Sequence, residues 1–196
     1  AFEMAFWAVA SGVYDIVLVF GAEKTPRGPV SVTSETSPAR LLGTDHMMAS
    51  YALRARRYME EFGATREAFA HVAEKAHRNA VHNPYAQFQK VFTMEEILNS
   101  RMIADPLTLY QCCPTSEGAS ATVICAREVA TKYKMELKRL VGITGMGIKT
   151  SAFEDRHGEH LITARTAKEA YERAGIGPRD VNVVQVHDSA TNAGMF

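Results

Sequence analysis

The sequence predicts an α/β fold, because two segments of similar pattern stand near its two ends. Residues 1–11 have the composition of a helix, Gly12 ends it, and residues 16–20 (IVLVF) form an unbroken apolar run. Toward the other end, Gly175 closes a second helix before residues 181–186, a further run rich in valine. Such runs are typical of strands buried on both faces of a parallel sheet. The repeat indicates layers of helix and sheet built from two similar halves.

The first helix is apolar on nearly every face, which predicts burial on several sides. Its large side chains are Phe2, Met4, Phe6, Trp7 and Val9. No capping residue precedes it, so we expect this helix to begin before Ala1.

Local signals place further elements between these two segments. Residues 121–125 (ATVIC), followed by a helix through Tyr133, repeat the strand-and-helix pattern, and residues 140–143 supply a fourth strand. Capping-box pairs at helix starts are Thr93 with Glu96 and Thr166 with Glu169.

A helical insertion is predicted between the two halves. Residues 25–44 are rich in Pro, Gly, Ser and Thr, which predicts a loop. Residues 45–62 and 65–81 then have the pattern of two amphipathic helices separated by Gly63. Their basic residues are Arg54, Arg56, Arg57, Arg66, Lys75 and Arg78. These side chains form either a solvated face or an anion site, such as one for the phosphates of a nucleotide-like cofactor.

Composition disfavours nucleic-acid binding and a membrane-spanning role. The 196 residues hold 22 basic and 22 acidic side chains, so the chain lacks the positive excess that nucleic-acid binding needs. No apolar stretch approaches the ~20 residues of a membrane-spanning helix, so we expect no membrane span. Three cysteines, two of them adjacent, suit a reducing compartment, and a cytoplasmic or organelle-lumen location is expected.

His187 is the leading candidate for chemistry, because it follows the predicted strand 181–186 and open α/β sheets bind ligands at the carboxyl ends of their strands. A structural histidine bonded to neighbouring backbone is the alternative. Asp188 either orients His187 or caps the next turn.

Two other strings are dense in groups that contact ligands. Residues 111–120 (QCCPTSEGAS) combine small residues with backbone donors, and residues 82–89 (HNPYAQFQ) hold polar and aromatic side chains around an Asn-Pro turn. Cys112 and Cys113 are either structural thiols or a metal or nucleophile site. A lone Cys-Cys pair gives little support to zinc, so no metal is expected.

Together, HNPYAQFQ, QCCPTSEGAS and the VHD of residues 186–188 resemble thiolases of the sterol-carrier-protein type, as does ASGVYDIVLVFGAEK at residues 10–24. The resemblance implies two βαβαβαββ halves in an α-β-α-β-α layering, with an inserted, mainly helical loop domain, here incomplete at both ends. It divides the chain into the end of the first half (1–30), the loop domain that holds CoA (31–119), the last strand and helix of the first half (120–139) and the start of the second half (140–196).

The resemblance also implies the chemistry, in which a 3-oxoacyl-CoA is cleaved by free CoA or two acyl-CoA molecules condense in the reverse direction. CoA is then a substrate, and no cofactor is bound covalently. The nucleophilic cysteine of the family would lie before Ala1, and none of Cys112, Cys113 and Cys125 matches it. His187 would form part of an oxyanion hole, an effect of about 3 kcal/mol for one donor.

The remaining site residues are carried over in the same way. Asp188 would orient His187, and Ser116, Gly118, Ala119 and Tyr85 would contact CoA or the acyl substrate. The acidic residue that the family usually carries after the motif is replaced here by the Asn-Ala-Gly of residues 192–194.

The partners expected are acyl-CoA and CoA, a second copy of the chain as a homodimer or dimer of dimers, and a small OB-fold protein of the DUF35 type. Two other functions stay open. One is a thiolase-like aldolase of steroid side-chain degradation, which works with such an OB-fold partner and carries Tyr where His187 stands. The other is a non-catalytic relative that binds lipid or acyl-CoA.

Overall fold

The computed structural model describes residues 1–25, 28, 30–31, 37–150 and 161–192 of the chain. The contacts divide it into two compact units, each discussed by itself. Unit 1 combines residues 1–23 with 117–184, and unit 2 combines residues 24–116 with 185–196. Within the described ranges, no helix is both long and apolar enough to cross a membrane.

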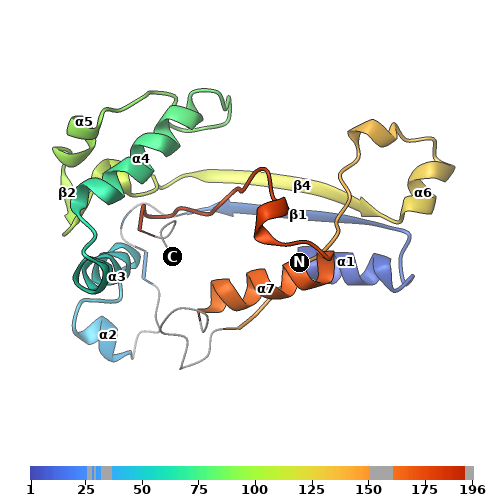
Figure 1. The fold of residues 1–196 in the computed structure, drawn as a ribbon, viewed down its shortest axis with the longest axis horizontal. Helices are drawn as coiled ribbons and strands as arrows, with labels where there is room; N and C mark the ends of the chain where they lie inside the picture. The colour runs from blue at the N-terminus through green and yellow to red at the C-terminus, as the bar shows by residue number, and fades with distance from the viewer. Residues whose placement is uncertain (26–27, 29, 32–36, 151–160, 193–196) are drawn as a thin grey trace. The chain divides into compact units, whose positions relative to one another are not determined.

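Unit 1 is built around a two-stranded sheet. Strand β1 (Ile16–Lys24) pairs with β4 (Glu117–Cys125), and the two strands run in opposite directions (Figure 1). The Ala126 N–H donates to the Asp15 carbonyl at 3.3 Å, which closes the end of this ladder. The helices are α1 (Phe2–Ala10), α6 (Arg127–Lys132) and α7 (Ile162–Ala174), with 3₁₀ turns η2 (Leu137–Arg139) and η4 (Pro178–Asp180).

The predicted helices of unit 1 are confirmed, although one detail of the first differs. Ser11, rather than Gly12, is the C-cap of α1, and Gly12 follows it with φ 74°. Gly175 ends α7 in the left-handed conformation, as the sequence predicts. The helix through Tyr133 is α6, which has Tyr133 as its C-cap.

Burial in unit 1 is much lower than the sequence predicts. Ala5 is the buried residue of α1, while Met4 is 77% exposed. On β1, Leu18 is 61% and Phe20 73% exposed, so burial on both faces of a parallel sheet is wrong for this strand in the described structure. The physical reason is that β1 and β4 pair with each other alone among the described residues, which leaves most of the sheet without a packed layer.

Two predicted strands are absent from the described structure. Residues 140–143 and 181–186 have no strand assignment, and Val183 and Val184 are 85% and 69% exposed. A strand requires a neighbouring backbone to complete its ladder, and neither segment has one in the described residues. An apolar β-branched run alone therefore does not establish a strand.

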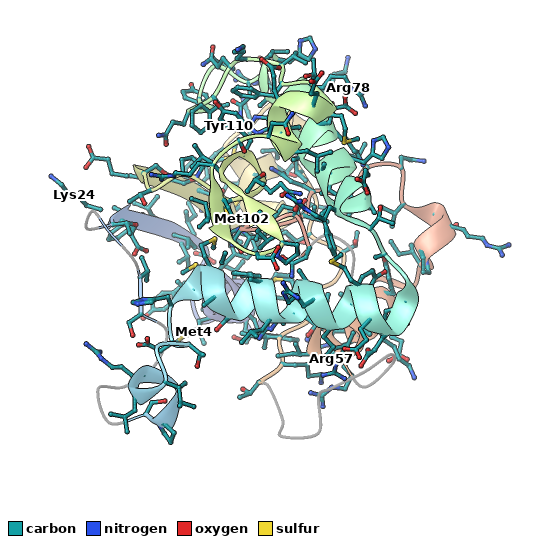
Figure 2. The ribbon with its side chains drawn as sticks, turned by 90° about the vertical axis from the view of Figure 1, so that its left-hand side faces the viewer. Met4, Lys24, Arg57, Arg78, Met102 and Tyr110 are labelled. Atoms are coloured by element: carbon teal, nitrogen blue, oxygen red, sulfur yellow. The ribbon has the colours of Figure 1, made fainter. Side chains whose placement is uncertain are left out.

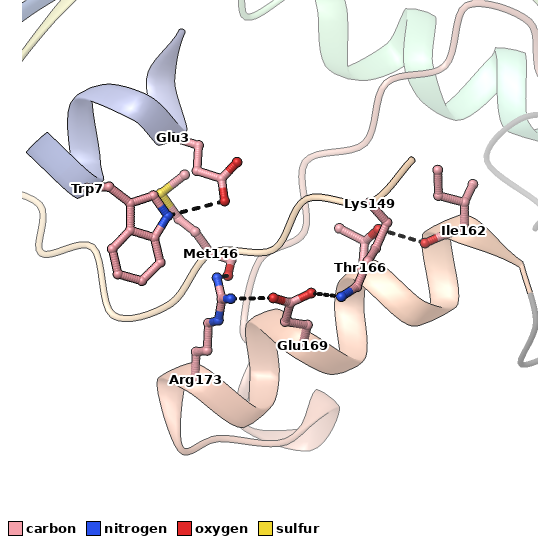
Figure 3. Close-up of polar contacts among 8 residues, drawn as sticks. All are labelled: Glu3, Trp7, Met146, Lys149, Ile162, Thr166, Glu169 and Arg173. Atoms are coloured by element: carbon pink, nitrogen blue, oxygen red, sulfur yellow. Dashed lines mark hydrogen bonds and ion pairs between the residues drawn. The ribbon is translucent and has the colours of Figure 1, made fainter. Parts of the chain in front are cut away.

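The predicted capping box of Thr166 and Glu169 is also wrong. Helix α7 has Leu161 at its N-cap, so Thr166 lies one turn inside the helix, where its hydroxyl donates to the Ile162 carbonyl at 2.7 Å. Glu169 instead lies between the side chains of Lys149 and Arg173 (Figure 3). These contacts hold the pKa of the Glu169 carboxyl below its usual range, with the Lys149 hydrogen bond as the largest cause.

The same network ties residues 145–149 and the first helix to α7. Arg173 Nη1 donates to the Met146 carbonyl at 2.9 Å, and the guanidinium carbon lies 5.3 Å from the centre of the Trp7 ring (Figure 3). Trp7 Nε1 in turn donates to Glu3 at 3.3 Å. Arg173 of α7 thus makes a cation–π contact with Trp7 of α1.

Unit 2 is mainly helical. Its helices are α2 (Pro38–Leu41), α3 (Met47–Phe62), α4 (Arg66–Ala80) and α5 (Met94–Leu98), followed by strands β2 (Met102–Ala104) and β3 (Leu107–Thr108) and the 3₁₀ turn η1 (Leu109–Gln111). The predicted helices over 45–62 and 65–81 are confirmed as α3 and α4, with Gly63 in the left-handed conformation between them. The capping box of Thr93 and Glu96 is confirmed at α5.

The predicted loop over 25–44 is interrupted by α2, which the sequence reading missed. Ser37 caps this short helix by accepting a hydrogen bond from the Ala39 N–H at 3.2 Å, and Pro38 stands at its first position. Part of this stretch, residues 26–27, 29 and 32–36, lies outside the described residues.

The core of unit 2 depends on alanines that let its elements approach closely. Ala52 and Ala55 of α3 pack with Phe69 of α4, Leu107 of β3 and Ala190. A second cluster joins α4 to α5 through Ala70, Ala73, Phe92 and Ile97. Figure 2 shows α3, where Arg57 is labelled, running along the β2–β3 hairpin, where Met102 is labelled. Ala190 is fully buried, so the segment after His187 is part of this core.

We expect Gly145→Ala to destabilise unit 1 by about 1–3 kcal/mol, the usual cost of overpacking. A Cβ at Gly145 would lie 2.5 Å from the Ala170 carbonyl oxygen and 2.8 Å from the Ala174 Cβ, both on α7. Urea denaturation followed by the fluorescence of Trp7, the single tryptophan of the chain, measures the change in unit 1.

Gly142→Ala is the matched control, since a Cβ there meets nothing within 4 Å. Its unfolding midpoint should stay close to that of the natural sequence. Equal midpoints for the two variants would contradict the close packing of residues 145–149 on α7.

Candidate active site

Three strings that the sequence singles out line one cavity of about 230 Å³ within unit 2. HNPYAQFQ contributes Ala86, Gln87 and Phe88; QCCPTSEGAS contributes Gln111 through Pro114; and the segment after His187 contributes Asp188 and Thr191. Helix α4 supplies the opposite wall with Val72, Ala73, Ala76, His77 and Ala80, and Tyr110 completes the lining. Segments separated by about 20 to 100 residues in the sequence therefore line a single cavity.

An aromatic cluster supports one side of the cavity. The Phe92 ring stacks on Tyr110 with centroids 4.1 Å apart, and the His77 ring meets Phe92 edge-on at 4.7 Å. His77 Nε2 also lies 3.1 Å from the Tyr110 carbonyl oxygen. These contacts fix α4 against η1 and give the cavity a rigid wall.

The short turn η1 holds Gln111 by hydrogen bonds that the local sequence provides. The Gln111 Oε1 accepts from the Thr108 backbone N–H at 2.9 Å, which forms a capping box over the turn. The Thr108 hydroxyl donates to the Ile97 carbonyl at 2.7 Å. Thr108 and Gln111 are both buried, so this turn is anchored to α5 before the QCC string begins.

The segment after His187 is attached to the QCC string by an antiparallel bridge. Cys112 pairs with Ala190, the Cys113 N–H donates to the Ser189 carbonyl at 3.0 Å, and the Thr191 N–H donates to the Gln111 carbonyl at 3.1 Å. This pairing brings Asp188 to the cavity. The pairing just after the motif is a single bridge and not a strand, and the strand predicted before the motif, at residues 181–186, is absent from the described structure.

Asp188 and His187 are placed differently by this arrangement. Asp188 is half-buried and lines the cavity, and burial raises the pKa of its carboxyl while His187 and Lys75 oppose that rise. Its Oδ1 is buried and has no hydrogen-bond partner in the described part of the chain. His187 is exposed and does not line the cavity.

The other residues that the resemblance implies lie at the surface. Tyr85 is 94% exposed, and its N–H donates to the Asn83 side chain at 3.0 Å, which sets the turn that leads to the cavity-lining residues Ala86–Phe88. Ser116 is exposed and belongs to unit 2, while Gly118 and Ala119 are exposed on β4 of unit 1.

The three cysteines have different surroundings. Cys112 is partly buried, and burial raises the pKa of its thiol to about 11, with a smaller contribution from Cys113. A thiol with this pKa is protonated at neutral pH and is a poor nucleophile. Cys113 is exposed, and Cys125 ends β4. No group of three or more metal-ligating side chains is present in the ranges that the structure describes.

The sequence reading missed the contribution of the helices. Ala73, Ala76 and His77 of α4 line the cavity, and Tyr51 of α3 bonds to the segment after His187. The helical periodicity marks Ala73 as a core position. It gives no indication that Tyr51 contacts Ser189 and Asn192, because these residues lie 138 and 141 positions further along the chain.

Comparison with known proteins identifies similar sequences and folds. The family model described as "Thiolase, N-terminal domain" matches residues 1–128. The benzoylsuccinyl-CoA thiolase subunit BbsB of Thauera aromatica is 37% identical over 98% of this chain and 51% of its own length. Sterol carrier protein 2 of Bos taurus is 33% identical over 96% of this chain and 38% of its own length.

Among solved structures, an aldolase described as Ltp2–ChsH2(DUF35) superposes with a TM-score of 0.77 at 26% identity, over 97% of this chain and 52% of that one. The described fold is therefore of the thiolase-like α/β class. The chain spans about half the length, or less, of the curated relatives reported above.

We expect Cys112 to resist alkylation near neutral pH, because its high pKa leaves little thiolate. In a Cys113→Ser variant, iodoacetamide labelling of the Cys112 peptide, followed by mass spectrometry, should accelerate roughly tenfold per pH unit between pH 7 and 10. The urea-denatured variant is the control and should label faster at pH 8. Equal labelling rates in the folded and denatured states would contradict the burial of Cys112.

Proposed function

Because the chain belongs to the thiolase family, we propose that the whole protein is a CoA-dependent acyltransferase that cleaves a 3-oxoacyl-CoA with free CoA or runs the reverse Claisen condensation. The observation that carries the proposal is the meeting of HNPYAQFQ, QCCPTSEGAS and the segment after His187 at one cavity. Relatives named as thiolase subunit and acetyl-CoA acetyltransferase support it.

In this proposal, His187 donates a hydrogen bond to the thioester oxygen as that oxygen gains negative charge. Its exposure in unit 2 leaves the imidazole free to meet a substrate, and the bridged segment that follows it gives the backbone a fixed position. One such preorganised donor contributes about 3 kcal/mol to transition-state stabilisation. Asp188 acts as its orienting neighbour, and its adjacency in sequence and the opposing effect of His187 on the raised pKa of the Asp188 carboxyl support that role.

The loop that holds CoA is proposed to include Ser116, Gly118, Ala119 and Tyr85. All four are exposed, and the small residues leave room for a pantetheine chain to approach the backbone. We assign residues 31–119 as the CoA-binding loop domain, with residues 1–30 and 120–139 from the first thiolase half and residues 140–196 from the second.

For two basic residues of the insertion, the structure favours a solvated face over an anion site. Arg56 pairs with Asp105 and Arg57 with Glu61, and the side chains of these pairs are between 37% and 64% exposed. Exposed ion pairs of this kind are typical of a solvated protein surface.

The attacking thiolate is proposed to come from a cysteine outside residues 1–196. The protonated, partly buried Cys112 does not fit the role. A thiolate nucleophile needs a lowered pKa, typically from a helix N-terminus or a nearby cation.

We also propose protein partners and a cellular location. The exposed side chains of Ile16, Leu18 and Phe20 on β1 support an interaction surface, which fits a homodimer or a dimer of dimers. A small OB-fold protein of the DUF35 type is a second candidate, because the aldolase relative is described with such a component. We propose a cytoplasmic location, or a peroxisomal or mitochondrial one in a eukaryote.

A thiolase-like aldolase is the second candidate function, and the 0.77 TM-score to the Ltp2–ChsH2(DUF35) aldolase favours it. His187 distinguishes the two, since the aldolases that the sequence resembles carry Tyr at this position. CoA-dependent cleavage of acetoacetyl-CoA by the full-length protein indicates a thiolase, and CoA-independent release of an acyl-CoA from a 3-hydroxyacyl-CoA side chain indicates the aldolase.

We expect His187→Ala in the full-length protein to lower kcat for acetoacetyl-CoA thiolysis about 100- to 1,000-fold, as for the loss of other oxyanion donors. His71→Ala is the control, because the His71 side chain is 70% exposed on α4 and does not line the cavity. Unchanged kcat in His187→Ala, with normal turnover in the control, would contradict the role of His187 as an oxyanion donor.

The chain of residues 1–196 alone should give no thiolysis above the background without enzyme, because covalent catalysis requires a thiolate and the proposed nucleophile lies outside these residues. The full-length protein, assayed beside it at equal concentration, is the positive control. Comparable turnover in both would show that Cys112, Cys113 or Cys125 is the nucleophile.

A further inference from the structure

One tyrosine of α3 contacts both ends of the short segment that follows the His187–Asp188 motif. The Ser189 hydroxyl donates to the Tyr51 hydroxyl at 2.5 Å, and the Asn192 Nδ2 donates to the Tyr51 carbonyl at 3.1 Å. Ser189 is 5% exposed, Asn192 is fully buried and Tyr51 is partly buried, so both bonds are partly shielded from water. A buried hydrogen bond is costly to break, because its partners are then left unpaired.

The opposite side of this segment is fixed by the QCC string through the bridge of Cys112 and Ala190. Residues 189–192 are therefore held between α3 and the QCC string, all within unit 2. Phe69 and Leu107 pack with Ala190 in the same core, and Tyr51 lies against it. The backbone has little room to shift here, because packed cores deform poorly.

The His187 side chain, by contrast, has no hydrogen bond or ion pair from the described residues that holds its ring. Its position depends on the backbone that leads into Ser189. A hydrogen bond from an imidazole to a developing oxyanion weakens steeply with distance and angle, so a small shift of that backbone alters the interaction.

We propose that Tyr51 is a positioning residue for His187, acting through the hydrogen bond of its hydroxyl to Ser189. The inference rests on the proposed role of His187 as an oxyanion donor. Tyr51 touches neither substrate nor reacting atoms in this account. Its ring packs against the core of unit 2 and its hydroxyl fixes the residue two positions after the imidazole.

The first test compares Tyr51→Phe, Ser189→Ala and the double variant in the full-length protein. Tyr51→Phe keeps the ring and removes only the hydroxyl. We expect each single variant to lower kcat about fivefold and to change KM less than twofold, since the loss falls on transition-state stabilisation. The double variant should lose no more than either single variant, because both substitutions remove the same hydrogen bond.

Tyr133→Phe is the matched control, since Tyr133 is 61% exposed at the end of α6 in unit 1. It should leave kcat and KM unchanged. Additive losses in the double variant, or an equal loss in Tyr133→Phe, would overturn the proposal.

The second test reads the position of the His187 ring without any need for turnover. In the full-length protein with ¹³C-labelled histidine, the resonance absent from a His187→Gln sample belongs to His187. Tyr51→Phe and Ser189→Ala should both shift this resonance, while the resonance of the exposed His71 stays in place. Tyr133→Phe should shift neither.

The two tests separate the inference from the proposed function. Normal thiolysis in His187→Ala would refute the oxyanion role of His187. A shifted His187 resonance in Tyr51→Phe would still show that the Tyr51 hydroxyl positions His187. An unmoved His187 resonance in Tyr51→Phe and Ser189→Ala overturns the inference, whatever the turnover. If Tyr51→Phe loses its cooperative melting transition, Ser189→Ala alone decides both measurements.

Discussion

The candidate site depends on the antiparallel bridge between the QCC string and the segment after His187. The bonds from the Cys113 N–H to Ser189 and from the Thr191 N–H to Gln111 join two parts of the chain that lie about 80 residues apart. Without them, Asp188 would have no fixed place beside the cavity formed by α4 and the HNPYAQFQ turn. The bridge therefore brings residues of the three strings together around one cavity.

Burial makes this bridge specific. Thr108, Gln111, Ser189, Thr191 and Asn192 are all at most 5% exposed. The Thr108 and Ser189 hydroxyls, the Gln111 Oε1 and the Asn192 Nδ2 have hydrogen-bond partners, whereas the Gln111 Nε2, Thr191 Oγ1 and Asn192 Oδ1 have none among the described residues. Desolvated polar groups that lose a partner cost about 1–3 kcal/mol each, so a shifted register would be penalised at several places. The hydrogen-bond pattern thereby selects one arrangement of the segment after His187.

The elements that the sequence predicts correctly depend on local interactions. The Thr93 and Glu96 capping box and the left-handed Gly63 and Gly175 are set within one or two helical turns, and each is confirmed. The strand at 181–186 needs a distant partner to exist, and its valine-rich pattern could not reveal that the partner is missing from the described residues. Thr166 fails for a related reason, because its helix begins one turn earlier and its hydroxyl bonds within the helix.

The same distinction applies to the candidate site. The three strings could be chosen from the sequence, and they do meet at one cavity, but the contact of Tyr51 with Ser189 joins residues 138 positions apart and has no local pattern. The exposure of β1 could not be predicted from its sequence either, since the burial of a strand depends on what packs over it and not on its own side chains. Long-range pairing is thus the part of the site that only the structure supplies.

Amide hydrogen exchange tests the central bridge most directly. The Cys113 and Thr191 amides should exchange slowly and at similar rates, and Val183, which is 85% exposed and has no strand partner among the described residues, should exchange rapidly. Exchange of Cys113 and Thr191 at the rate of Val183 would contradict the bridge and, with it, the shared cavity.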